Sequence, residues 1–303
     1  MRIIDFFDKG ATRYPDNIAF VDAAGHCSYR KASVQTHWIA SALHGKQFGR
    51  GAHIGILAPT SNEAFLALLG VFRAGAIWLP INPRKSVAIT SELLNRLDCE
   101  LLLFHSIYEE QAKKIISRSP SLRLALCIDT KNEFGESLTE WMRDADYHFP
   151  QAEPSPDDIS SVFLTVGTTG PAQRVVMTHR NIAAVFANYY ARFNYYDNTR
   201  HLFVAPMTHS AVVRGCLHFA RGGTNVIMST VDPGGILQAI QEHRITHLFI
   251  PTTLLTMMLI HPDINLYDYS SLQHFLIGAA PTPLEKLKEA TEVFGPVVTE
   301  YDG

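Results

Sequence analysis

The sequence has 303 residues, of which 47% are apolar and 18% are charged, so it predicts a folded chain with a sizeable core and excludes intrinsic disorder. Lys and Arg total 26 against 29 for Asp and Glu, and the formal net charge is -3. No basic face is visible in the pattern of these charges, which argues against a nucleic-acid-binding protein.

Export and membrane insertion are not expected. Acids near the N-terminus interrupt the apolar run that a secretory signal needs, and the longest apolar stretch, residues 64–81, contains Arg73 and two glycines. The four cysteines lie far apart and form no C-x-x-C pair, which is typical of reduced, mostly buried thiols. We therefore expect a cytoplasmic protein.

Strand and helix signals alternate in the first half of the chain. Residues 53–57 and 77–81 are predicted strands, and an amphipathic helix lies between them. We expect Thr60 and Glu63 to form a capping box at the start of this helix and Gly75 to end it. Together these elements make one βαβ unit, which favours an α/β fold with mainly parallel sheets covered by helices.

A candidate linker covers residues 149–158, which include three prolines and few apolar groups. It predicts two αβ subdomains, residues 1–150 and 151–303. The second half again alternates. Strands are predicted at 202–205, 224–228, 247–250 and 275–277, and helices around 211–219, around 236–243 and from residue 282.

A hydroxyl-rich glycine loop follows the apolar strand that ends near Leu164 and precedes an amphipathic helix that Thr178 is placed to cap. Such a loop can aim several backbone N–H groups and hydroxyls at one polyphosphate. Gly167 and Gly170 would let the phosphates approach the backbone closely. We interpret the loop as a nucleotide site; the alternative is that its glycines serve only the turn.

This segment resembles the phosphate-binding signature of the acyl-adenylate-forming enzymes, a family of acyl-CoA synthetases, luciferases and peptide-synthetase adenylation domains. Their pattern is T-S-G-T-T-G-x-P-K-G followed by V-x-x-T-H-R-N. It is matched at Thr165, Gly167, Thr168, Thr169, Gly170, Val175, Thr178, His179, Arg180 and Asn181. It is not matched at Val166, Ala172, Gln173 and Arg174, which replace serine, proline, lysine and glycine. The resemblance implies that ATP phosphates bind Thr165, Gly167, Thr168, Thr169, Gly170 and, in place of the missing lysine, Arg174.

Later segments match the same family in the same order. Residues 206–209 resemble its P-x-x-H element, which implies an acyl pocket at His209, Ser210 and Val212, and Pro251-Thr252 resembles its P-T element, which lies near substrate. Taken alone, His209 could be structural and Thr252 could be a helix cap. No aspartate stands near His209, which favours an acid without an α-amine, since a buried ammonium group would need a partner.

Residues 278–281 resemble the G-G-A-P element that borders adenine, so the resemblance assigns Gly278, Ala279 and Ala280 to the adenine site. A flat ring can lie against backbone only where side chains are absent. The family's next element is Y-G-x-T-E. In the favoured register Asp302 and Gly303 take the Y-G positions of the adenine site, so the stacking aromatic is lost. The alternative register uses Thr299-Glu300 as T-E and Phe294-Gly295 as the aromatic–glycine pair.

The resemblance implies activation of a fatty or aryl acid by ATP and Mg²⁺ to an acyl-adenylate, and its transfer to CoA. It also implies the fold of the large N-terminal domain of these enzymes, without the C-terminal domain. We expect this chain to be an N-terminal portion, with no metal ligand and no complete catalytic set, inactive alone. The alternative is a non-catalytic module that binds an acyl group or a partner on a degenerate scaffold, motivated by Val166, Gln173 and Asp302. A homodimer is left open.

Overall fold

The protein is described by a computed structural model that covers residues 1–130, 136–146, 155–164, 173–193, 195–208 and 210–301. The helices are α1 (Ile3–Arg13), α2 (Tyr29–Gly45), α3 (Asn62–Arg73), α4 (Val87–Arg96), α5 (Glu109–Ile116), α6 (Leu138–Arg143), α7 (His179–Arg192), α8 (Ser210–Leu217), α9 (Pro233–Glu242), α10 (Thr252–Leu259) and α11 (Leu284–Phe294). The strands are β1 (Ile18–Asp22), β2 (Gly25–Ser28), β3 (His53–Leu57), β4 (Ile77–Pro80), β5 (Leu101–Phe104), β6 (Leu124–Cys127), β7 (Ile159–Leu164), β8 (Arg174–Thr178), β9 (Arg200–Phe203), β10 (Thr224–Ile227), β11 (His247–Pro251), β12 (His274–Gly278) and β13 (Val298–Tyr301).

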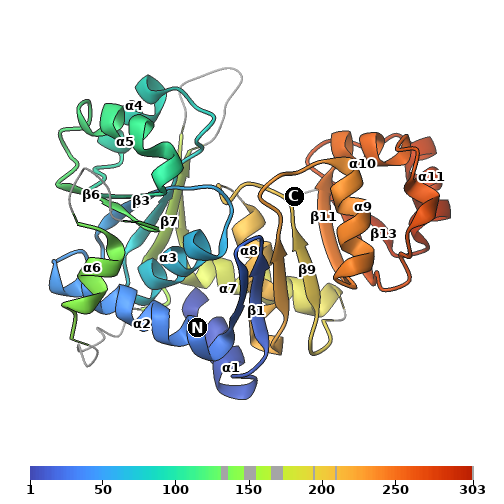
Figure 1. Ribbon diagram of the computed structural model, residues 1–303, viewed down its shortest axis with the longest axis horizontal. Coiled ribbons are helices and arrows are strands. Elements are labelled where there is room, and N and C mark those ends of the chain that lie inside the picture. The colour runs from blue at the N-terminus through green and yellow to red at the C-terminus, as the bar shows by residue number, and fades with distance from the viewer. Residues whose placement is uncertain (131–135, 147–154, 165–172, 194, 209, 302–303) are drawn as a thin grey trace.

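Two sheets organise the described part of the chain (Figure 1). The first has six strands in the order β6-β5-β3-β4-β7-β8, and the second has seven in the order β13-β12-β11-β9-β10-β1-β2. Neighbouring strands are parallel except at β7–β8 and β1–β2. The predicted α/β fold with mainly parallel sheets is therefore confirmed.

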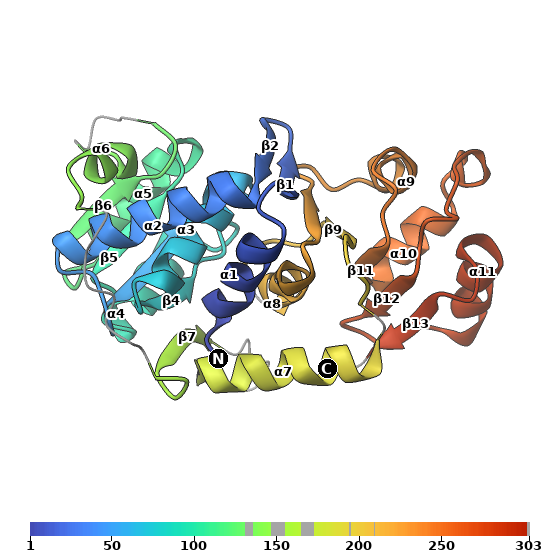
Figure 2. The same ribbon diagram turned by 90° about the horizontal axis from the view of Figure 1, so that it is seen from below.

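Three apolar clusters show how helices cover these sheets. One joins the first sheet to α4 and α5, and another joins the second sheet to α9, α10 and α11. The largest lies between the two sheets and includes side chains of α1, α2, α3, α7 and α8. The arrangement is thus helix, sheet, helix, sheet, helix. Figure 2 shows α7 extending from the side of β7 towards β13.

The two sheets do not divide the chain at residue 150. Strand β1 joins the second sheet by pairing with β10, at Phe20 opposite Asn225, and β7 joins the first sheet by pairing with β4, at Trp78 opposite Ser161. Each half therefore supplies strands to the sheet of the other. Most of the predicted linker, residues 149–154, lies outside the described residues.

The start of α3 corrects one local prediction. Ser61 is the N-cap, and its Oγ accepts a hydrogen bond from the Ala64 N–H over 3.2 Å. The predicted capping box of Thr60 and Glu63 is therefore wrong, because the helix starts one residue later. Gly75 follows the helix end with φ of +74°, a left-handed conformation that glycine adopts without steric cost.

A second correction concerns the glycine loop. The sequence predicted that a helix follows the loop directly. In the structure Arg174–Thr178 first forms β8, which pairs antiparallel with β7. The loop thus connects the two strands of a hairpin, and α7 follows the second strand. Thr178 caps α7 as predicted.

Candidate functional site

The carboxyl ends of strands from the two sheets lie next to one another. Thr60, just after β3, donates a hydrogen bond over 3.4 Å to the carbonyl oxygen of Ala205, just after β9. Asp22, the last residue of β1, accepts one over 2.8 Å from the backbone N–H of Asn62 at the start of α3. Ligands of open α/β sheets bind outside the carboxyl ends of strands, so this junction is the natural place for a site.

Arg174 stands at the base of the glycine loop. It begins β8 directly opposite Leu164, the last residue of β7, and its side chain is exposed. The five other predicted phosphate-binding residues, Thr165, Gly167, Thr168, Thr169 and Gly170, lie outside the described residues. The structure therefore places a cation beside the loop without placing the loop itself.

The residues of the T-H-R-N motif hold the start of α7. Thr178 Oγ1 accepts a hydrogen bond from the Asn181 N–H over 3.1 Å, and Asn181 Oδ1 accepts one from the Thr178 N–H over 2.9 Å, which is a reciprocal cap. Arg180 forms a two-bond pair with Asp157, at 2.6 and 2.7 Å. His179 is fully buried, and burial lowers its pKa to about 4. These residues fix the segments around the loop.

The predicted adenine-site residues lie at the carboxyl end of β12. Gly278 pairs with Tyr301 of β13, and a Cβ atom at Gly278 would lie only 2.2 Å from the Tyr301 carbonyl oxygen, so no other residue fits there. Ala279 and Ala280 are exposed, and Ala279 has φ of +68°. The result is a stretch of nearly bare backbone at the edge of the sheet. Asp302 and Gly303 lie outside the described residues.

Thr252 ties two of the predicted elements together. It is the first residue of α10, after Pro251 at the N-cap, so it does not cap the helix. Its hydroxyl donates to the carbonyl oxygen of Ala280 over 2.8 Å and lies 2.9 Å from Thr282 Oγ1. Among the predicted acyl-pocket residues, Val212 of α8 is buried in the central core, Ser210 begins the same helix, and His209 lies outside the described residues.

Tyr301 lies beside the predicted adenine-site residues, and the sequence patterns did not single it out. It ends β13 opposite Gly278, and its ring lies 5.7 Å from that of Tyr189 on α7. The guanidinium of Arg214, on α8, lies 3.7 Å from the ring centre of Phe249 and 5.2 Å from that of Tyr301. The signal was present in the sequence, since Tyr301 is one residue before the position assigned to the aromatic.

In the alternative register, Phe294 is the aromatic residue and Glu300 the glutamate of the family pattern. Phe294 is buried, and its ring packs 4.8 Å from those of both Tyr269 and Phe275, away from the carboxyl edge. Glu300 accepts a hydrogen bond over 2.7 Å from the backbone N–H of Thr282. Phe294 thus belongs to the core, and Glu300 holds the loop after Ala280.

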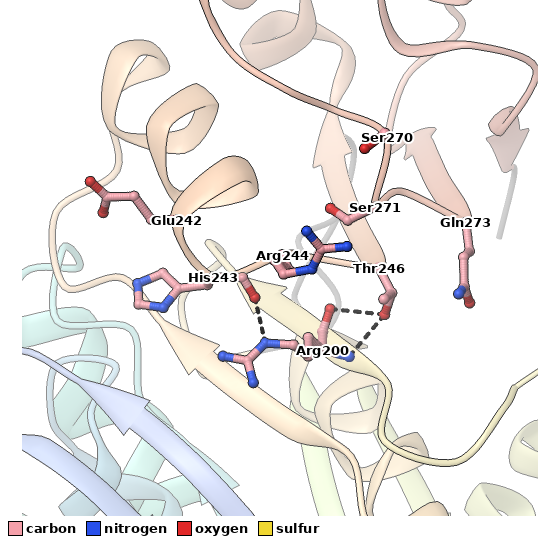
Figure 3. Close-up of a pocket in the computed structure, with 8 residues that line it drawn as sticks. All are labelled: Arg200, Glu242, His243, Arg244, Thr246, Ser270, Ser271 and Gln273. Atoms are coloured by element: carbon pink, nitrogen blue, oxygen red, sulfur yellow. Dashed lines mark hydrogen bonds between the residues drawn. The ribbon is translucent and has the colours of Figure 1, made fainter.

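A wide hollow of about 580 Å³ lies at the opposite edge of the second sheet, where β9, β11 and β12 begin (Figure 3). Arg200 donates hydrogen bonds there from its Nε to the His243 carbonyl and from its backbone N–H to Thr246 Oγ1. None of the predicted site residues that the structure describes lines this hollow. It is therefore separate from the carboxyl-edge site.

Metal ligands and membrane spans are both missing from the described residues. Within those ranges, no three His, Cys, Asp or Glu side chains are grouped as metal ligands. The helices that the structure describes also include none with the length and apolar character needed to cross a membrane. The four cysteines are buried and unpaired with one another, as expected.

Comparison with known proteins gives one family. Residues 7–301 match the family described as AMP-binding enzyme. The chain is 27% identical over 263 residues to a medium/long-chain-fatty-acid–CoA ligase of Mycobacterium tuberculosis, covering 84% of this chain and 46% of the relative. It is 26% identical over 260 residues to feruloyl-CoA synthase of an Amycolatopsis species, covering 85% and 50%. The chain thus spans about half the length of these relatives.

Solved structures show the same fold. The N-terminal domain of FACL13 from Mycobacterium tuberculosis matches with a TM-score of 0.89 at 22% identity, covering 99% of this chain and 74% of that one. The amide bond synthetase McbA from Marinactinospora thermotolerans matches with a TM-score of 0.90 at 22% identity, covering 100% and 60%. At this identity the likeness shows the fold alone, and it confirms the predicted domain type.

Proposed function

The chain belongs to the AMP-binding enzyme family, and from this premise we propose that it takes part in ATP-dependent activation of a carboxylic acid and ligation of the acyl group to CoA. In the first step a carboxylate oxygen attacks the α-phosphorus of ATP, and the bond to pyrophosphate breaks. In the second the thiolate of CoA attacks the acyl carbon, and AMP leaves. The protein's part is to position the groups and to balance charge on the phosphates.

One observation carries this proposal: elements that are far apart in sequence meet at the carboxyl edges. Thr252 and Gly278–Ala280 lie together where β11 and β12 end, and the base of the glycine loop lies where β7 ends in the other sheet. The Thr60–Ala205 hydrogen bond joins the carboxyl ends of the two sheets, which supports a shared place for a polyphosphate, a flat base and an acid. Arg174, at the base of the loop, supplies positive charge one position after Gln173, which stands where the related pattern has lysine.

We assign the adenine contact to Tyr301 rather than to the position of Asp302. Tyr301 ends β13 beside Gly278, where an aromatic ring and bare backbone can enclose a flat base. This places the Y-G-x-T-E pattern one residue earlier than the register favoured from sequence. Asp302 then stands at the glycine position.

The acid is proposed as fatty or aryl, since the relatives are named as ligases for fatty acids and feruloyl groups. Mg²⁺ would accompany ATP. The described residues include no group of three metal-ligand side chains, and Glu300 is engaged with the Thr282 backbone, so no residue of this part of the chain is assigned to Mg²⁺.

The test is ATP–pyrophosphate exchange with a panel of fatty and aryl acids, on the full product of the gene that encodes this chain. Exchange that depends on an added acid supports the proposal. The second candidate is a non-catalytic module that binds an acyl group, which Gln173 favours because it stands in place of the lysine. That candidate predicts acid binding without exchange. If the protein showed neither pyrophosphate exchange nor acid binding, both candidate functions would be contradicted.

A further inference from the structure

One face of the second sheet carries a regular pattern of side chains. His247 of β11 stands in register with His201 of β9 and with His274 of β12. Two residues further along, Phe249 is in register with Leu276. Because side chains alternate between faces, these residues point to the same side, where α7 and α8 pack.

The next step along these strands reaches the carboxyl edge. Pro251 is in register with Gly278, and Gly278 with Tyr301. The face thus runs from the proposed nucleotide site, past Phe249 and Leu276, to a row of histidines. From Gly278 to His274 there are four residues, which at about 3.3 Å each is roughly 13 Å.

A small cavity lies at the inner end of this face. It is lined by the side chains of Tyr195, Arg214, Phe249 and Leu276 and by four histidines, His201, His218, His247 and His274. Its free volume is about 10 Å³, which is room for one small group. The Arg214 guanidinium lies between this cavity and the carboxyl edge, over Phe249 and near Tyr301.

His247 presents an unused polar atom in this cavity. The residue is 4% exposed, and its Nε2 is buried with no hydrogen-bond partner among the described residues. Its Nδ1 lies 2.7 Å from Thr246 Oγ1, and its ring stacks 4.9 Å from that of Tyr195. The ring is therefore fixed, and a buried polar atom without a partner is destabilising, so a ligand group that reaches it would bind favourably.

Neighbouring histidines already have one partner each. His201 Nδ1 lies 2.9 Å from Asn225 Oδ1, and His218 Nδ1 lies 2.8 Å from Thr199 Oγ1. Burial lowers the pKa of His201 to about 4 and keeps the pKa values of His218 and His247 well below the usual range. His201, His218 and His247 are thus neutral at pH 7, and the charged group of the cavity is the Arg214 guanidinium on the side of the carboxyl edge. The neutral ring of His247 suits an uncharged hydrogen-bonding group, and a hydroxyl can donate or accept, whichever tautomer His247 adopts.

We infer that the acid activated by this protein carries a hydroxyl or phenol group at its far end, and that His247 Nε2 recognises this group at the floor of the acyl pocket. The inference rests on the proposed function, because it is the acid's carboxylate that would lie at the carboxyl edge. His247 is then a specificity-determining residue. An acid of the same length that ends in a methyl group would leave Nε2 without a partner.

The experiment compares pairs of acids of equal length, one hydroxyl-ended and one methyl-ended, by calorimetric binding to the full chain. Wild-type protein is expected to bind the hydroxyl-ended acid about 10-fold more tightly. His247→Phe keeps an aromatic ring but removes the nitrogen, and it should reduce the preference to less than about twofold. His26→Phe, at an exposed position on β2, is the matched control and should keep the full preference.

A second readout does not depend on how the variant folds. With ¹⁵N-labelled histidine in wild-type protein, the Nε2 resonance of His247 should shift on addition of the hydroxyl-ended acid and not with the methyl-ended one. Equal affinity for both acids in wild-type protein, or an unmoved Nε2 resonance, would overturn this inference and leave the proposed function standing. Failure of every acid both to bind and to support pyrophosphate exchange would overturn the proposed function and, with it, the inference.

Discussion

Ala279 adopts a backbone conformation that favours glycine, with φ of +68°, at the point where the related pattern G-G-A-P has its second glycine. A Cβ atom in this conformation is crowded by the backbone and costs on the order of 1–2 kcal/mol. Ala280 beside it has no such conformation. The sequence pattern identified this segment as small, but the strain at one of its two alanines is visible only in the structure.

Replacing Ala279 with glycine should therefore raise the free energy of unfolding by about 0.5–1 kcal/mol, because relief of strain exceeds the added entropy of the unfolded chain. The measurement is urea unfolding. Ala280→Gly is the control and should lower stability by a similar amount through chain entropy alone. Equal effects at both positions would contradict this account of Ala279.

His201 makes stability depend on pH. Burial, the largest cause, lowers its pKa in the folded protein from 6.5 to about 4, and Arg214 acts in the same direction. Between these two values the unfolded chain binds more protons than the folded chain, so stability is complete above pH 6.5 and is lost as the pH falls towards 4. The contribution of His201 is on the order of 3 kcal/mol.

We expect His201→Gln, which can still hydrogen-bond Asn225, to have a shallower loss of unfolding free energy between pH 6.5 and 4 than wild-type protein. The slope should not vanish, because the pKa of buried His179 is also lowered to about 4. Parallel profiles for the two proteins would mean that His201 does not titrate as the structure indicates.

Strand β13 depends on the glycine that ends its neighbour. The backbone of Tyr301 approaches Gly278 so closely that a Cβ atom there would lie 2.2 Å from a carbonyl oxygen, and backbone cannot move aside as a flexible side chain can. The pairing of β12 with β13 is what holds Tyr301 at the carboxyl edge. Packing alone therefore requires a glycine at position 278, independently of its proposed place beside adenine.

Gly278→Ala should lower the free energy of unfolding by about 1–3 kcal/mol, since the strands must separate or distort to admit the methyl group. Gly45→Ala provides the contrast. Gly45 ends α2, and a Cβ atom there would meet nothing within 4 Å beyond its own helix backbone and chain neighbours. This change should be neutral or stabilising by up to about 1 kcal/mol. If Gly278→Ala were tolerated as well as Gly45→Ala, the close approach would be contradicted.

Local elements were predictable where a single stretch of sequence determines them. The strand His53–Leu57, the stop at Gly75 and the Thr178 cap were all found as expected. Strand β8 was missed because Arg174–Thr178 is too short to show a period and becomes a strand only by pairing with β7. Val175 and Val176 of this strand are both exposed, so the strand lacks the alternation of buried and exposed side chains that a sequence pattern would reveal.

The arrangement of the whole molecule was less accessible from sequence. The division of strands between the sheets follows from parallel pairing across more than 200 residues, as between Phe20 and Asn225, which no local pattern encodes. The histidine cluster has the same origin, because His201, His247 and His274 come together only through strand register. By contrast, the position of Thr252 and Gly278 at the carboxyl ends of β11 and β12 was predictable, since each residue follows a predicted strand.

The central claim is that the base of the glycine loop at the carboxyl edge binds the phosphates of ATP. Calorimetric titration of the chain with ATP tests it most directly, in wild-type protein, in Arg174→Ala and in Arg30→Ala, which removes an exposed arginine of α2 that pairs with Asp16. We predict that Arg174→Ala weakens ATP binding by about 10-fold or more, as for loss of a charged hydrogen bond, and that Arg30→Ala leaves it unchanged. Equal ATP affinity in all three proteins, or no ATP binding by wild-type protein, would contradict the account.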